Sequence, residues 1–143
     1  MTSVTSSQLQ FLTLPLGTFD ELAATIESAA GARAEGLVLL LTVVVAANAR
    51  RVAALALQRG LPAIFWQSEF AEVGGLMGYG PDYFYLWQRA GALVGRILKG
   101  ARPADLPVEQ ADRFRLVVNL KAAKALGLTI PQTPLLRVDQ VIK

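Results

Sequence analysis

Short apolar segments alternate with helical repeats of apolar residues through the first third of the chain. Residues Leu9 to Leu14 predict a first strand, and Thr18 with Glu21 three positions later predicts a capping box at the start of a helix. Four apolar residues recur on one face of that helix, namely Phe19, Leu22, Ile26 and Ala30. The pattern therefore predicts a β-α unit at the start of the chain.

A second unit of the same kind follows. Gly36 to Val45 is a continuous Leu and Val run without alternation, which predicts a strand covered on both faces in the middle of a parallel sheet. Apolar residues at helical spacing then predict a helix from Ala46 to Arg59, which Gly60 ends. Pro62 precedes a short apolar strand from Ala63 to Trp66, so the β-α-β alternation continues.

The centre of the chain predicts a long helix after two short elements. Glu69 to Val73 is a loop or helical turn, and Gly75 to Tyr79 is an extended segment. Pro81 and Asp82 then begin a strongly amphipathic helix that Gly100 ends. Its apolar face consists of Tyr83, Leu86, Trp87, Ala90, Val94 and Ile97.

The last part of the chain predicts a connector, a strand and a short helix. Ala101 to Gln110 contains two prolines and indicates an extended connector. Arg113 to Asn119 alternates as a strand, Lys121 to Leu126 is a short helix, and the tail after Pro131 is a weak helical turn. The whole alternation predicts an α/β protein with a parallel sheet of four or five strands flanked by helices and joined by right-handed crossovers.

Composition adds an apolar surplus to this picture. The chain has 143 residues, enough for one domain, and 53% of them are hydrophobic while only 17% are charged. Burying a large exposed apolar patch between molecules is favourable, so we expect a homodimer or larger assembly. The net charge of +3 is spread over single residues and pairs, which argues against nucleic acid.

Neither a membrane span nor an export signal is predicted. The longest apolar run, Leu37 to Ala47, is about half of the roughly 20 residues that a spanning helix needs. The first eight residues lack the basic start and the apolar stretch of a secretory signal.

Several catalytic chemistries lack their residues in this sequence. The chain contains no histidine and no cysteine, which excludes Ser-His-Asp and Cys-His catalysis and zinc sites with imidazole and thiolate ligands. The glycines at positions 74, 75, 78 and 80 form neither a dinucleotide fingerprint nor a P-loop, and we interpret them as residues that permit tight turns and close packing. We therefore expect no enzyme, no metal and no cofactor.

Aromatic residues are concentrated around the predicted strand ends, where open α/β sheets bind ligands. Eight of the eleven lie between Phe65 and Trp87. Helical spacing makes Tyr83 and Trp87 core residues, whereas Trp66, Tyr79 and the nearby Glu69 are better candidates for a binding site. Glu69 and Glu72 together are more consistent with a solvated face than with a catalytic carboxylate pair.

Three stretches of the sequence carry a resemblance to a known family. They are Leu61-Pro-Ala-Ile followed by Glu69-Phe70 and Gly74-Gly-Leu-Met-x-Tyr-Gly-Pro81, then Ile97-Leu-Lys-Gly-Ala-Arg-Pro-Ala-Asp-Leu-Pro-Val-Glu-Gln110, then Phe114-x-Leu-Val-Val-Asn-Leu-Lys-x-Ala-Lys-Ala-Leu-Gly-Leu-Thr-Ile-Pro131. Together they resemble the C-terminal part of ABC-transporter substrate-binding proteins of the tryptophan/tyrosine-importer-like group. The resemblance covers nearly the whole chain.

The resemblance implies part of a type I periplasmic-binding fold, in which two lobes close on a small solute and deliver it to a membrane permease. It implies second-lobe β-α units in residues 1–80, a hinge-crossing helix and connector in 81–110, and a closing strand, helix and tail in 111–143. Family members are longer and have a signal peptide and a first lobe, so the implied location is periplasmic or extracytoplasmic. We expect this shortened chain alone not to bind its solute tightly.

The predicted ligand-binding residues are Thr42, Trp66, Glu69, Tyr79 and Asp82, and the predicted solute is an amino acid or a related small carboxylate. Two strand ends depart from the family pattern. The chain has Leu41-Thr42-Val43 where relatives often carry Pro-Asp-Pro, and Trp66-Gln67-Ser68 where Gly-Trp-Arg is common. The first change removes an acidic group able to face a ligand amine.

Two other functions are compatible with the same fold. A ligand-sensing domain of a regulator is one, although the N-terminus contains no helix-turn-helix. A small Rossmann-like enzyme is the other, and it would need a phosphate loop or a general base.

Overall fold

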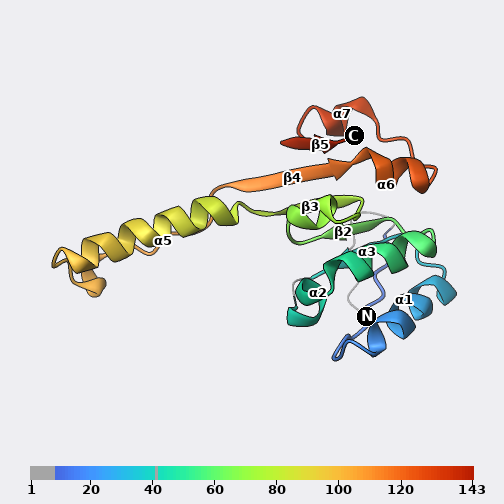
Figure 1. The fold of residues 1–143 in the computed structure, drawn as a ribbon, viewed down its shortest axis with the longest axis horizontal. Coiled ribbons are helices and arrows are strands. Elements are labelled where there is room, and N and C mark those ends of the chain that lie inside the picture. The colour runs from blue at the N-terminus through green and yellow to red at the C-terminus, as the bar shows by residue number, and fades with distance from the viewer. Residues whose placement is uncertain (1–8, 41) are drawn as a thin grey trace.

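The protein is a five-stranded sheet with helices packed on it and one helix that projects away from it (Figure 1). A computed structural model describes residues 9–40 and 42–143. The predictions for the first eight residues and for Leu41 therefore lie outside the described residues.

The strands follow each other in the sheet in chain order. β1 Leu37–Leu39, β2 Ala63–Phe65 and β3 Met77–Pro81 are parallel, and β5 Gln140–Ile142 is parallel to β4 Phe114–Asn119. β3 and β4, however, are antiparallel. The predicted α/β fold is confirmed as a mostly parallel sheet, with this one antiparallel pair as a correction.

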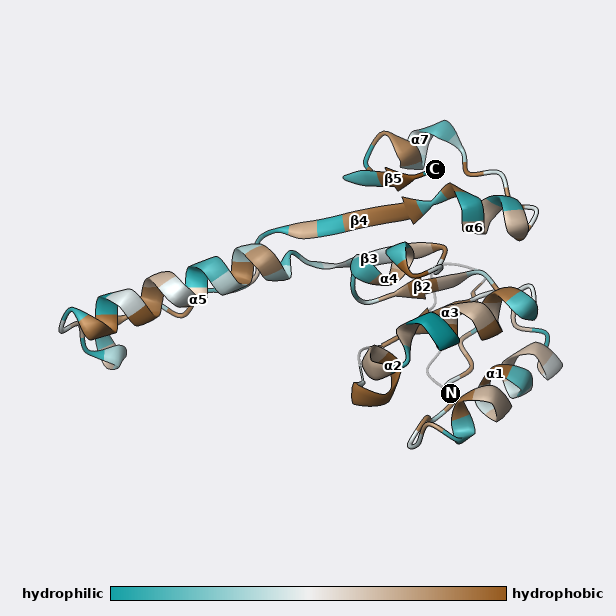
Figure 2. Ribbon diagram, viewed as in Figure 1, coloured by the Kyte–Doolittle hydropathy of each residue, from teal (hydrophilic) through white to brown (hydrophobic). Residues whose placement is uncertain are grey.

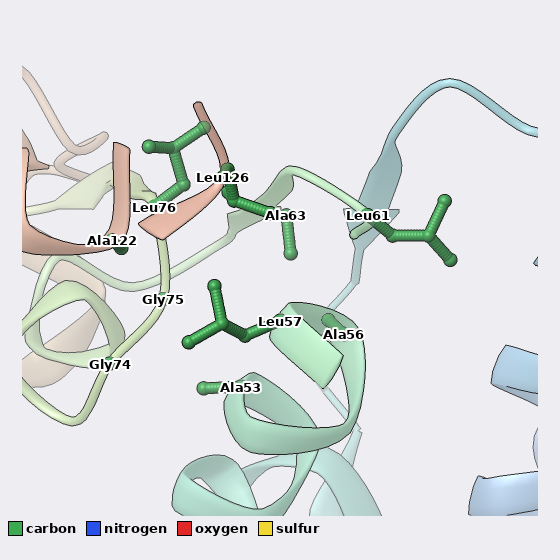
Figure 3. A pocket seen from close by; sticks show the side chains of 10 residues that line it. All are labelled: Ala53, Ala56, Leu57, Leu61, Ala63, Gly74, Gly75, Leu76, Ala122 and Leu126. Carbon is green, nitrogen blue, oxygen red and sulfur yellow. The ribbon is translucent and has the colours of Figure 1, made fainter. Parts of the chain in front are cut away.

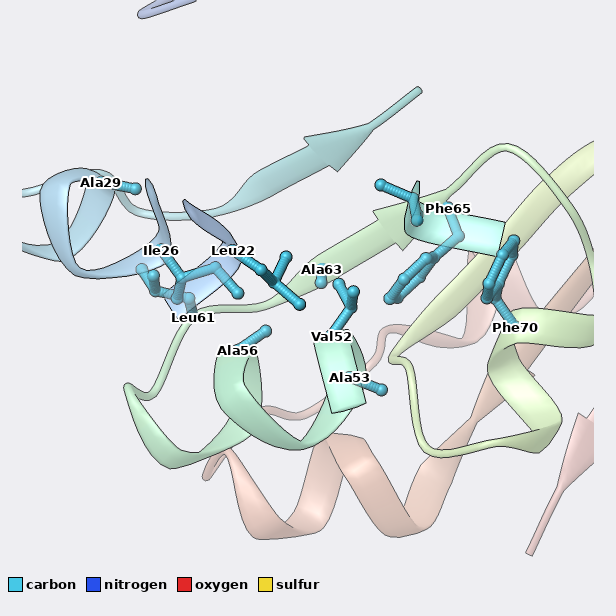
Figure 4. Close-up of a cluster of buried hydrophobic side chains, with 11 residues drawn as sticks. Leu22, Ile26, Ala29, Val52, Ala53, Ala56, Leu61, Ala63, Phe65 and Phe70 are labelled. Carbon is cyan, nitrogen blue, oxygen red and sulfur yellow. The ribbon is translucent and has the colours of Figure 1, made fainter. Parts of the chain in front are cut away.

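The main core lies between the sheet and the first helices. α1 Glu21–Gly31, α3 Ala49–Gln58 and α4 Glu69–Glu72 pack their apolar residues against β2 (Figure 4). The rings of Phe65 and Phe70 stack with their centroids 4.9 Å apart. Among the described residues, the largest fully buried side chains are those of Phe65, Leu22, Val52, Val117 and Val118.

The predicted first strand is absent. Residues 9–14 have no regular structure, and Leu9, Phe11 and Leu12 are exposed. The helix after them begins at Glu21, and Glu21 Oε2 accepts hydrogen bonds from the N–H groups of Gly17 and Thr18. Half of the predicted capping box is therefore formed.

The predicted long buried strand from Gly36 to Val45 is wrong. β1 has three residues and lies at the edge of the sheet, where 68% of the Val38 side chain is exposed. Thr42 ends the extended run because its Oγ1 accepts from the Val45 N–H and caps α2 Val43–Ala47. Asn48, with φ −122°, separates α2 from α3, so the single helix predicted over 46–59 is two helices.

The long central helix forms as predicted but does not pack as predicted. α5 Tyr83–Leu98 projects from the sheet with no buried residue, and the chain returns beside it through the 3-10 helix η1 Pro103–Asp105 (Figure 1). Trp87, expected in the core, is 72% exposed. No other described segment packs on the side of α5 that contains Trp87, so the amphipathic spacing did not lead to burial of this side.

The C-terminal part contains one strand that the sequence did not predict. α6 Leu120–Ala125 ends at Gly127, which has φ +68°, and α7 Gln132–Leu135 is the expected helical turn. β5 then adds three residues to the sheet beside β4.

Candidate functional site

The predicted site residues lie around the carboxyl ends of the first three strands. Trp66 directly follows β2, and its N–H donates to the carbonyl of Leu39 at the end of β1, at 3.3 Å. Thr42 follows β1, while Tyr79 lies in β3 and Asp82 directly after it. Because parallel strands end at the same edge, these residues share one edge of the sheet.

Glycines hold β3 against the segment that contains Trp66. A Cβ atom at Gly80 would lie 1.7 Å from the carbonyl oxygen of Trp66, and one at Gly78 would lie 2.5 Å from that of Gln67. Gly74 has φ +116°, a backbone conformation that residues with a side chain rarely adopt. The interpretation of these glycines as packing and turn residues is confirmed.

Trp66 and Tyr79 face the side of the sheet opposite to the buried core. The register pairs Phe65 with Gly78, and successive side chains of a strand alternate between faces. Phe65 is buried, so Trp66, the residue after it, points away from the core, as does Tyr79, the residue after Gly78. Trp66 is 41% exposed and Tyr79 is 50% exposed. The Tyr79 ring stacks on Phe114 of β4 at a centroid distance of 5.7 Å.

Tyr83 joins this aromatic group, contrary to its prediction as a core residue. The indole Nε1 of Trp66 donates a hydrogen bond to the Tyr83 hydroxyl at 3.0 Å. Tyr83 is the first residue of α5, so the bond ties the end of β2 to the base of the projecting helix. The concentration of aromatic residues between 65 and 87 was the feature of the sequence that could have identified Tyr83 as a site residue. We call Trp66, Tyr79, Tyr83 and Phe114 the aromatic edge.

The polar site candidates have local structural roles. Asp82 Oδ1 accepts from the Tyr85 N–H at 3.1 Å and caps α5, as Thr42 caps α2. Glu69 is an exposed residue of the first turn of α4. Within residues 9–40 and 42–143, no hydrogen bond joins Thr42 or Glu69 to the aromatic edge. The structure thus brings Trp66, Tyr79 and Asp82 to the base of α5.

The base of α5 also contains a cation. The Arg113 guanidinium carbon lies 4.1 Å from the centroid of the Tyr85 ring, and the Arg113 carbonyl accepts from the Asp82 N–H at 2.9 Å. A carboxylate and a guanidinium therefore belong to neighbouring residues of paired segments beside the aromatic edge.

Two hollows of the described chain lie away from this edge. One is lined by small and apolar residues of α3, α6, β2 and the segment before β3, and its volume of about 10 Å³ is that of a single water (Figure 3). The other, about 260 Å³, is an open depression between α1 and α3 beside the Glu27–Arg59 ion pair. The aromatic edge is an exposed surface, since 41% of Trp66 and 50% of Tyr79 are accessible to solvent.

Open α/β sheets bind ligands outside the carboxyl ends of their strands, which is where this chain presents aromatic and charged groups. Comparison with known families assigns a binding function to this fold. The profile of the ABC transporter substrate binding protein family matches residues 2–142, and the chain belongs to this family. It is a family of substrate-binding proteins and not of enzymes. None of the described helices is long and apolar enough to cross a membrane.

Solved structures of similar proteins give the same fold. A conserved domain protein from Vibrio cholerae is 26% identical with a TM-score of 0.78 over 86% of this chain. An ABC domain from Streptococcus pneumonia in complex with L-Trp is 29% identical with a TM-score of 0.78 over 87%. A ligand-free, open substrate-binding protein with adhesive properties from Clostridium difficile is 27% identical with a TM-score of 0.64 over 90%.

The chain spans about two fifths of the length of these structures, from 41% to 42%. No curated protein sequence matches it significantly.

Proposed function

We propose that the protein is the solute-binding component of an ABC import system and that its solute contacts the aromatic edge. The observation that carries the proposal is the Trp66–Tyr83 hydrogen bond, which holds an exposed indole outside the carboxyl end of β2. The fold and the family match support a binding function at that edge. The protein itself performs no chemistry in this proposal.

The proposed solute is an aromatic or branched amino acid, or a related small carboxylate. A flat apolar side chain is able to stack on Trp66 and Tyr79, and stacking of aromatic rings adds to simple burial. Asp82 and Arg113 offer opposite charges beside these rings, which matches the ammonium and carboxylate of an amino acid. A similar structure contains L-Trp, which supports the aromatic class. Thr42 and Glu69 are proposed as outer contacts of the same solute.

The proposed partners are a membrane permease and a second copy of this chain. In this proposal residues 1–80 and 111–143 provide one lobe and its closing elements, while 81–110 lead toward the other lobe. The site of action is periplasmic or extracytoplasmic.

The two tryptophans provide the test. Trp66 lies at the aromatic edge and Trp87 lies one helical turn beyond Tyr83 on α5, so the two indole N–H resonances report on the edge and on the helix beside it. During titration with L-phenylalanine up to several tens of millimolar, the Trp66 resonance shifts saturably and by more than the Trp87 resonance. The Tyr83→Phe variant removes the acceptor of the Trp66 indole and alters the starting position of that resonance.

Leu128→Ala, at an exposed position of the loop after α6, is the matched control and leaves the titration unchanged. An unchanged Trp66 resonance, or equal shifts at Trp66 and Trp87, contradicts a site at the aromatic edge.

A further inference from the structure

The unit formed by α5 and its connector, residues 83–112, is attached to the sheet by a narrow base, and we call it the α5 arm. Figure 2 shows α5 leaving the sheet where β3 ends and the chain returning where β4 begins. The last backbone bond between the two segments joins the Asp82 N–H to the Arg113 carbonyl at 2.9 Å. Among the described helices and strands, none packs along α5. Two paired segments without packed neighbours allow a rigid unit to pivot.

Close packing fixes the sheet side of this base. Gly80 of β3 lies directly against the chain after β2, because a Cβ atom at Gly80 would be 1.7 Å from the carbonyl oxygen of Trp66. On the neighbouring strand, Phe114 stacks on the Tyr79 ring at a centroid distance of 5.7 Å. Movement of the arm is therefore confined to the short segments between these contacts and α5.

The arm side of the base is held together by its own contacts. Asp82 Oδ1 accepts from the Tyr85 N–H at 3.1 Å, which fixes Asp82 to the first turn of α5. The Arg113 guanidinium lies over the Tyr85 ring. Further along, Arg89 Nε donates to Glu109 Oε2 at 2.8 Å and holds the connector on the helix. The arm is consequently able to move as one body, with the pivot at residues 81 and 113.

One side-chain hydrogen bond spans this pivot. Trp66, on the sheet side, donates its indole N–H to the hydroxyl of Tyr83, the first residue of α5, at 3.0 Å. Within the described part of the chain, it is the only side-chain hydrogen bond between the arm and the sheet. A hydrogen bond of ordinary net strength shifts an equilibrium by roughly 2- to 12-fold. Such a bond selects one direction of the arm, and a stacking contact on the indole is of comparable strength.

We propose that the Trp66–Tyr83 hydrogen bond is a latch that fixes the direction of the α5 arm relative to the sheet, and that the arm pivots when this bond opens. Trp66 also belongs to the aromatic edge, so a molecule that stacks on the indole and turns it opens the latch. This last step rests on the proposed function. The latch itself needs no solute and its test contains none, so its failure leaves the solute titration valid.

Spin-label distances test the latch cleanly because the chain contains no cysteine to remove. Ala54→Cys in α3 and Ala92→Cys in α5 place one nitroxide on the body and one on the arm, both at exposed helical positions. Double electron–electron resonance gives a narrow distance distribution in the otherwise wild-type chain. Tyr83→Phe removes the acceptor, and we expect the population at other distances to rise roughly 2- to 12-fold. Trp66→Phe removes the donor and has the same effect.

Tyr85→Phe is the matched control, because it removes a hydroxyl two residues away and keeps the ring under Arg113. It leaves the distribution narrow. A distribution in Tyr83→Phe as narrow as in the wild type overturns the proposal. Equal broadening by Tyr85→Phe, or a wild-type distribution already as broad as that of Tyr83→Phe, overturns it as well.

Exchange of the two indole N–H protons with solvent provides a second measurement. The Trp66 proton is bonded to Tyr83, whereas Trp87 is 72% exposed and serves as the internal reference. We expect the Trp66 proton to exchange more slowly than the Trp87 proton in the wild type and in Tyr85→Phe, and at a similar rate in Tyr83→Phe. Equal exchange of both protons in the wild type contradicts the latch.

Discussion

Asn119 is one of two polar residues that are buried among those described, and it joins three elements. Its Nδ2 donates to the carbonyl of Ala71 in α4 at 2.8 Å, and its Oδ1 accepts from the Ala122 N–H at 3.0 Å and caps α6. Buried polar groups are costly when they lose their partners. This side chain therefore has a greater structural role than its exposed polar neighbours.

We expect Asn119→Ala to lower the free energy of unfolding by about 2 to 4 kcal/mol, because it removes a helix cap and leaves the Ala71 carbonyl without its side-chain donor. Urea denaturation followed by circular dichroism measures the loss. Asn48→Ala, which removes a half-buried hydrogen bond from the residue after α2 to the carbonyl of Val44 in α2, is the control and costs only about 0.5 to 1.5 kcal/mol. Equal losses in the two variants contradict the role of Asn119.

A pair of glycine substitutions separates close packing from conformational freedom. Gly80→Ala forces a Cβ onto the Trp66 carbonyl, and we expect it to destabilise the protein by about 1 to 3 kcal/mol or more. Gly95→Ala meets no atom within 4 Å, and we expect it to stabilise α5 by about 0.5 to 1 kcal/mol. Thermal unfolding of both variants measures the difference, and a neutral Gly80→Ala contradicts the packing argument.

At the scale of elements, local signals located some segments and long-range contacts decided the others. Pro81, Asp82 and Gly100 mark the ends of α5 in the sequence, so that helix was predicted, as were β2, α4 and β4. β5 was missed because three residues, Gln140–Ile142, become a strand only through pairing with residues 117–119. The burial of α5 was predicted wrongly because amphipathic spacing shows which side is apolar but not whether anything covers it.

The site residues likewise divide into those that local signals identified and those that long-range contacts decided. Strand-end position and aromatic type were sufficient to select Trp66 and Tyr79 as exposed candidates, and the structure places them on one face. Tyr83 was missed because its helical spacing is equally consistent with a core residue. Its contact with Trp66 joins positions 17 apart in sequence and depends on how α5 leaves β3.

The contact between α5 and its connector should depend on pH. The hydrogen bond and the charge of Arg89 lower the pKa of Glu109 below its ordinary value, and desolvation opposes this shift only in part. A carboxylate with a lowered pKa in the folded state stabilises that state above its unfolded pKa of about 4.3, and this contribution is lost as the pH falls through the folded pKa. We therefore expect the connector to detach from α5 at acid pH before the sheet unfolds.

Amide hydrogen exchange of residues 101–112 between neutral pH and about pH 3, corrected for intrinsic exchange rates, measures this detachment. In Glu109→Gln the connector is already less protected at neutral pH and shows little further change. Full protection at the acid end of the range in the wild type contradicts the role of the pair.

At the scale of the whole molecule, the open aromatic edge limits affinity. Tight solute sites bury most of the ligand in a cleft and exclude water, whereas half of the Tyr79 side chain is exposed. One stacking contact of about 0.5 to 1.5 kcal/mol and one exposed charge contact of about 0 to 1 kcal/mol supply at most about 2.5 kcal/mol, compared with about 8 kcal/mol for micromolar binding. The dissociation constant of the single chain is therefore about 10 mM or higher.

Calorimetry against aromatic and branched amino acids should show no saturable heat at micromolar concentrations of the monomeric chain. The same titration at a concentration where the chain self-associates tests whether a second copy adds a wall. A micromolar isotherm in the monomeric chain contradicts the affinity argument.

The segment that forms the projecting helix leaves and re-enters the sheet at a single point. The Asp82 N–H bonds the Arg113 carbonyl where β3 and β4 run antiparallel, so residues 83–112 are an insertion in what is otherwise a β-hairpin. An Asn-Gly turn in their place matches the twist of such strands and closes a much shorter loop. We expect this excised protein to fold around the same sheet, which would make residues 83–112 a module that the sheet does not need in order to fold.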